Sequence, residues 1–113
     1  MPEAAEFLAG FNFIQGRVFA NYTLVSAVST HQSIKRYQEY FYDIVLIFKN
    51  GGQGIYNNLY DAVMNEIQQE HIIYGIRNPY RCIIDPPSYG NILQDGDGTI
   101  TFKLTGHSYR VYK

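Results

Sequence analysis

The alternation of apolar and polar positions is clearest over Tyr37–Lys49, which reads YQEYFYDIVLIFK and is the longest strand-like run of the chain. Side chains of a strand alternate between its two faces. The even positions are all apolar: Tyr40, Tyr42, Ile44, Leu46 and Phe48. The odd positions mix apolar and charged residues: Tyr37, Glu39, Phe41, Asp43, Val45, Ile47 and Lys49. We therefore expect the central strand of a small sheet, with one apolar face and one half-polar face.

The segment that follows the glycine-rich stretch Asn50–Gly54 has the period of an amphipathic helix. Its apolar positions recur every three to four residues and form one wide face: Ile55, Tyr56, Leu59, Tyr60, Val63, Met64 and Ile67. Asn, Asp and Gln occupy the outer positions. This pattern predicts the main helix at about residues 55–70, packed on the apolar face of the central strand.

The rest of the chain predicts shorter elements around this pair. Arg17–Val28 predicts a strand that forms an antiparallel hairpin with the central strand, and Ser29–Arg36 predicts a loop or the twisted tip of that hairpin. The remaining expected elements are a short helix over Pro2–Ala9, a strand or extended link over His71–Ile76, and strands over Tyr80–Asp85 and Thr99–Tyr112. Gly106 could introduce a bulge or bend in the last strand. The order predicts a single α+β domain, residues 1–113, with an antiparallel or mixed sheet.

Composition narrows the classes of function. The 113 residues are 46% hydrophobic and 17% charged, which is typical of a folded domain rather than a disordered chain. The formal charge is −1 and the nine basic residues are scattered, which argues against nucleic-acid binding. No signal peptide and no run of ~20 apolar residues is visible, so we expect synthesis in a reducing cytoplasm, without secretion or membrane insertion.

The segment Asp95-Gly96-Asp97-Gly98-Thr99 resembles two motifs in part. As an EF-hand loop it would place Leu93 and Leu104 at the positions of the first oxygen ligand and the bidentate glutamate. As the nucleophile motif of haloacid-dehalogenase-type phosphatases it lacks the large α/β domain that should follow. Asp-Gly pairs favour tight reversals, so the segment predicts a turn between two strands.

The other candidate chemical groups are isolated in the sequence. Gly51-Gly52-Gln53-Gly54 lacks the Lys-Ser/Thr of a phosphate-binding loop. His31, His71 and His107 are widely spaced, and no pair has the spacing of a helical metal site. A dyad of Cys82 and His107 stays open, because both could lie in one sheet. We expect no enzymatic activity, no cofactor and no metal.

The half-polar face of the central strand is the candidate functional surface. Exposed apolar area beyond a few hundred Å² usually marks an interface. The expected interface residues are Tyr37, Phe41, Val45 and Ile47, together with Lys35, Arg36 and Tyr89. Alternatively, the N-terminal helix or a bend of the sheet covers this face.

In its order of elements, its size and its lack of catalytic motifs, the chain resembles the tail-terminator, or tail-completion, proteins of long-tailed bacteriophages. The matching stretches are Arg17–Val25, Tyr37–Lys49, Ile55–Gln69, Arg81–Asp85 and Thr99–Tyr112. The resemblance implies a structural virion protein. It would form a homo-oligomeric ring, typically a hexamer, that joins the tail to the head and contacts tail-tube and head-completion proteins.

A second hypothesis is a small non-enzymatic binding or inhibitory module of phage or host. Such a module would hold its partner on the exposed aromatic strand face or on the loop at residues 88–98. Both hypotheses assign function to a surface rather than to a reaction centre.

Overall fold

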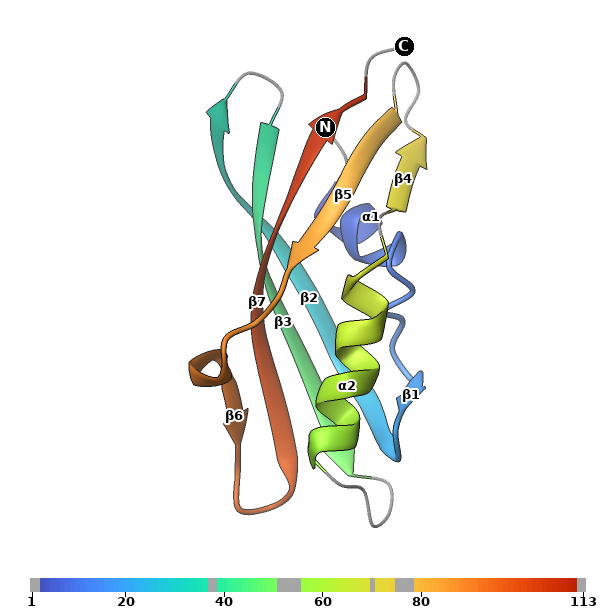
Figure 1. The fold of residues 1–113 in the computed structure, drawn as a ribbon, viewed down its shortest axis with the longest axis vertical. Helices are drawn as coiled ribbons and strands as arrows, with labels where there is room; N and C mark the ends of the chain where they lie inside the picture. The colour runs from blue at the N-terminus through green and yellow to red at the C-terminus, as the bar shows by residue number, and fades with distance from the viewer. Residues whose placement is uncertain (1–2, 37–38, 51–55, 70, 75–78, 112–113) are drawn as a thin grey trace.

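The computed structural model describes residues 3–36, 39–50, 56–69, 71–74 and 79–111 (Figure 1). In chain order the elements are α1 (Ala4–Ala9), β1 (Val18–Phe19), β2 (Tyr22–Arg36), β3 (Glu39–Asn50), α2 (Tyr56–Ile67), β4 (His71–Tyr74), β5 (Pro79–Asp85), the 3-10 helix η1 (Tyr89–Asn91), β6 (Ile92–Gln94) and β7 (Thr99–Arg110). The molecule is elongated, at 47 × 22 × 19 Å, and the β2–β3 hairpin runs along its length.

The strands form a seven-stranded sheet in the order β1-β2-β3-β7-β5-β4, with β6 paired to β7. Each of the recorded strand pairs is antiparallel. The predicted α+β class, the antiparallel sheet and the β2–β3 hairpin are therefore confirmed, and the domain is mostly sheet. β7 follows the other described strands in sequence, yet it lies between β3 and β5 in the interior of the sheet.

The even face of β3 is buried, as its alternation predicts. Tyr42, Ile44, Leu46 and Phe48 are each at most 1% exposed. They belong to one hydrophobic cluster that also contains Ile100, Phe102 and Leu104 of β7 and Leu59, Val63 and Ile67 of α2. Burying a Leu, Ile or Phe side chain contributes about 1.5–3 kcal/mol, so this cluster is the main stabilising feature of the fold.

The short helix α1 is held on the same buried face by an aromatic stack. The ring of Phe7 lies nearly parallel to that of Tyr42, with centroids 4.2 Å apart. It also lies over Gly106, where an added methyl carbon would meet the Phe7 Cζ at 2.7 Å and the Ile83 carbonyl oxygen at 2.9 Å. The expected bulge at Gly106 is wrong, because the register runs through it unbroken on both sides. The absence of a side chain at Gly106 allows the close approach of the Phe7 ring.

The β2 region departs from its expected boundaries. The predicted strand Arg17–Val28 is divided by a tight turn at Ala20 and Asn21, both with positive φ. The polar stretch Ser29–Arg36 continues as strand instead of forming a loop, because it pairs with β3 as far as Glu39. Three register shifts along this pairing absorb the extra residues of β2.

The turn expected at Asp95–Gly98 is confirmed. The Gly98 N–H donates to the Asp95 carbonyl at 3.1 Å, and the Thr99 N–H donates to Asp97 Oδ1 at 3.0 Å. The reversal joins β6 to β7, and β6 is a short strand within the segment that was expected only to be rich in turns. Gly51–Gly54 lies outside the described residues.

Candidate functional site

The face of the sheet opposite the buried cluster is called the open face here. Its side chains are half-buried or exposed, and they come from five strands, with β7 in the centre. They are Val28 of β2; Phe41, Asp43, Val45 and Ile47 of β3; Ile83 and Asp85 of β5; Leu93 of β6; and Thr101, Lys103, Thr105, His107 and Tyr109 of β7. Phe7 of α1 and Leu59 of α2 belong to the hydrophobic cluster, which contains none of the side chains of the open face. The alternative that the N-terminal helix covers Phe41, Val45 and Ile47 is therefore wrong.

The register arranges the open face in rows that run across the strands. At one end, Ile47 lies beside Thr101, which lies beside Leu93. In the next row Val28, Val45 and Lys103 are neighbours. Two rows that contain the acidic and aromatic side chains follow.

In the acidic row, Thr105 lies between Asp43 on β3 and Asp85 on β5. The Thr105 hydroxyl donates to Asp85 Oδ2 at 3.3 Å. Asp43 and Lys103 are both exposed, and among the described residues neither forms an ion pair. A positive and a negative group thus lie exposed in adjacent rows.

In the aromatic row, His107 lies between Phe41 and Ile83. Its ring centroid is 5.9 Å from that of Phe41 and 6.4 Å from that of Tyr109. His107 Nδ1 lies 3.5 Å from Asp85 Oδ1. Phe41 and His107 of this row, together with Tyr109 of the next row, form a stacked aromatic strip of the kind that protein interfaces favour.

The structure brings together only some of the expected interface residues. Phe41, Val45 and Ile47 share the open face as predicted. Lys35 and Arg36 lie at the end of β2 and Tyr89 lies in η1, and the side chains of all three are outside the described part of the structure. Tyr37 lies outside the described residues altogether.

Cys82 and His107 do not form a dyad. Cys82 is paired with Ser108 in the register, so it faces the buried side while His107 faces the open side. Burial raises the pKa of the Cys82 thiol to about 12. The thiol is therefore protonated at neutral pH, and a protonated thiol is a weak nucleophile.

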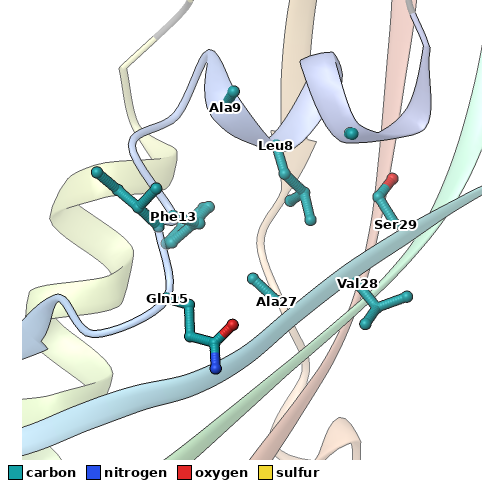
Figure 2. Close-up of a pocket in the computed structure, with 9 residues that line it drawn as sticks. Leu8, Ala9, Phe13, Gln15, Ala27, Val28 and Ser29 are labelled. Atoms are coloured by element: carbon teal, nitrogen blue, oxygen red, sulfur yellow. The ribbon is translucent and has the colours of Figure 1, made fainter.

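A hollow of about 320 Å³ lies between α1 and the β2 strand (Figure 2). It is lined by Ala5, Leu8, Ala9, Phe13, Ile14, Gln15, Ala27, Val28 and Ser29. Figure 2 shows Ala27 and Ser29 pointing toward α1, and Val28 pointing to the other side of the strand. The lining contains no titratable side chain, so this groove suits an apolar group rather than acid–base chemistry. Sequence reasoning missed the groove, although the small residues Ala5 and Ala9 on one side of α1 are a signal for it.

Two absences hold across the described ranges of the chain. No group of three or more His, Cys, Asp or Glu side chains is placed to hold a metal ion there. No helix in these ranges has the length and apolar character needed to cross a membrane. Comparisons of the chain with protein-family models, with curated proteins and with solved structures find no match.

Proposed function

We propose that this protein is a non-enzymatic structural protein that assembles with copies of itself through the open face. The observation that carries the proposal is a multi-stranded surface with Phe41, Val45 and Ile47, which no helix among the described residues covers. Apolar side chains gathered on an uncovered sheet face favour burial against a partner. The stacked strip of Phe41, His107 and Tyr109 adds the aromatic area that stabilises such contacts.

The type of assembly follows from the resemblance to phage tail-terminator proteins. The sequence of a short helix, a long hairpin, a main helix and closing strands supports that resemblance. The proposal includes α2 resting on the even face of β3, which is supported by the shared cluster of Leu59, Val63 and Ile44. On this basis the chain forms a ring, typically of six copies, at the junction of phage tail and head. Tail-tube and head-completion proteins are its further partners.

The test is the mass of the protein in solution, measured by size-exclusion chromatography with light scattering. Phe41→Asp should shift the wild-type oligomer to a monomer, because the added carboxylate cannot be buried without a partner charge. The matched control is Ile34→Asp, since Ile34 is 59% exposed and pairs with Tyr40, an even position of β3 on the side opposite the open face. Circular dichroism should show that both variants remain folded. A wild-type protein that is monomeric at high micromolar concentration, with and without tail-tube protein, would refute the proposal.

The groove beside α1 favours a second candidate, a binding module for an apolar peptide segment. Its lining is mostly apolar, with Gln15 and Ser29 as the polar residues, and among the described residues no strand pairs with β2 on the α1 side beyond Leu24. A peptide in extended form could add its backbone to that edge and place a side chain in the groove. Co-purification followed by mass spectrometry would recover such a partner, and Ala9→Trp should abolish its capture. Recovery of copies of this chain alone would reject the binding module.

A further inference from the structure

We propose that the open face is covered by the open face of a second copy, with Lys103 of each copy between Asp43 and Asp85 of the other. This inference rests on the proposed self-assembly and specifies its geometry. Two sheets stacked in this way lie about 10 Å apart, a distance that two facing layers of side chains fill.

The spacing of the rows fixes how the two copies match. Strands rise by about 3.3 Å per residue, so successive rows on one face are about 6.6 Å apart. Along the strands the order is the row of Ile47, the row of Lys103, the row of Asp43 and Asp85, and the row of Phe41. The Lys103 row and the acidic row are adjacent and carry opposite charges.

Consider a two-fold axis that lies between the two sheets and runs perpendicular to the strands. If it passes midway between these two rows, it places the Lys103 row of one copy opposite the acidic row of the other. Lys103 is on β7, and so is Thr105, which lies between Asp43 and Asp85. The axis therefore places each Lys103 above Thr105 of the second copy, between two carboxylates. A lysine side chain is long enough to reach either one across the interface.

The same axis also matches the apolar positions. It places Phe41 opposite Ile47 of the second copy, because both residues are on β3. It places Ile83 opposite Leu93 of the second copy, because β5 and β6 pair with the same side of β7. Leu93 is 47% exposed in the single chain. By symmetry each of these contacts occurs twice, so the charged centre is flanked by apolar pairs at both ends.

Three other face-to-face arrangements bring like charges together. An axis through the acidic row would place Asp43 opposite Asp43 of the second copy, and an axis through the Lys103 row would place the two lysines opposite each other. An axis parallel to the strands and centred on β7 would oppose Lys103 to Lys103 and Asp43 to Asp85. Like charges facing each other across an interface cost several kcal/mol, so charge favours the register with the axis between the rows. A pair of this kind is closed, so a ring of six copies consists of three such pairs that are joined through a second surface.

Charge reversal and mixing test the register by sedimentation velocity. Lys103→Glu and Asp43→Lys should each weaken self-association at least about tenfold, because each change opposes like charges. An equimolar mixture of the two variants should associate again, because the new carboxylate at position 103 of one copy then faces the new ammonium group at position 43 of the other. Asp61→Lys is the control, because it makes the same change of charge at an exposed position of α2. This variant should associate like the wild type.

Three outcomes are decisive for the two proposals. Recovery of association only in the mixture supports the face-to-face register. If Lys103→Glu and Asp43→Lys both associate like the wild type while Phe41→Asp does not, the register is wrong and self-assembly through the open face stands. If the wild-type chain does not associate at all, the proposed function fails together with the register. A cooperative thermal melt of each variant shows that the differences in self-association are those of folded chains.

Discussion

The ring of Phe7 lies over Gly106 on the buried side of the sheet, and no larger residue fits beneath it. A methyl group at position 106 would lie 2.7 Å from the Phe7 Cζ and 2.9 Å from the Ile83 carbonyl oxygen. To relieve these overlaps, both the β5 backbone and the packed Phe7 ring would have to shift. This contact ties α1 to the centre of the sheet.

Gly106→Ala should lower the free energy of unfolding by about 1–3 kcal/mol, the usual cost of overpacking a core. Urea unfolding followed by circular dichroism would measure it. Gly96→Ala is the control, because no atom lies within 4 Å of a Cβ at that turn position. The double variant with Phe7→Ala should lose less than the sum of the two single changes, because the clash needs the ring. Additive losses would show that Phe7 is not what excludes a side chain.

Arg17 and Glu66 form an ion pair that joins the N-terminal loop to α2. Arg17 Nη2 donates to Glu66 Oε2 at 3.1 Å, and Arg17 Nη1 donates to the Asn12 carbonyl at 2.9 Å. Glu66 is only 7% exposed, so Arg17→Met would leave a buried carboxylate without its partner. We expect a loss of about 2–3 kcal/mol in urea unfolding, because the arginine side chain is itself partly exposed.

The double change Arg17→Met and Glu66→Leu distinguishes the net contribution of the ion pair from the cost of leaving one buried charge unpaired. Replacing a buried ion pair with apolar groups is often neutral, so the double variant should recover most of the loss. A double variant as unstable as Arg17→Met alone would mean that the arginine acts through its contact with Phe19, whose ring centroid lies 4.4 Å from the guanidinium carbon.

Stability should fall as pH rises above about 9. Burial raises the pKa of Cys82 from 9.0 to about 12, and burial is also the main cause that raises the pKa of Tyr42 from 10.0 to about 12. The unfolded chain therefore releases these protons at lower pH than the folded chain. The stabilisation is fully present below pH 9 and is lost as pH rises toward 12. Melting temperatures between about pH 7 and about pH 11 would measure the fall.

The matched variants for this pH dependence are Cys82→Ala and Tyr42→Phe. Each removes one titrating group, so each should flatten the decline of melting temperature between about pH 9 and about pH 11. Iodoacetamide should label the native wild type far more slowly than the unfolded chain, because the thiol is buried and protonated. A thiol that labels as fast as a free cysteine peptide would contradict the burial of Cys82.

Ala9→Trp would report on the groove, because the chain contains no tryptophan. Its ring should rest against Leu8 and Phe13, which line the groove, and its emission should be blue-shifted from that of solvated indole. Val18→Trp places the same ring on an exposed position of β1 and serves as the control. Identical emission from both variants would show that the groove does not accept an aromatic group.

The alternation of apolar and polar residues along β3 predicted more of the fold than any sequence motif did. The even positions of β3 are buried because period-two patterning decides which side of a strand meets the core. The position of β7 was not predictable, because the pairing of distant strands leaves no local periodic signal. The odd residues Phe41, Val45 and Ile47 indicated the open face. That Lys103 and Asp43 lie in adjacent rows could be seen only from the pairing register of β3 and β7 in the structure. The same register separates Cys82 from His107, since a shift of one residue changes the face.

The interior place of β7 has a consequence for synthesis on the ribosome. β3 emerges well before β7, and the backbone edge that β7 later occupies stays unpaired while residues 51–98 are being translated. During that interval an apolar strand with an open edge can pair with other nascent chains. Once residues 99–110 are released, β7 pairs with both β3 and β5, so a strand made after its neighbours completes this sheet. Nascent chains that stop before Thr99 should therefore accumulate in the insoluble fraction, while full-length chains remain in solution.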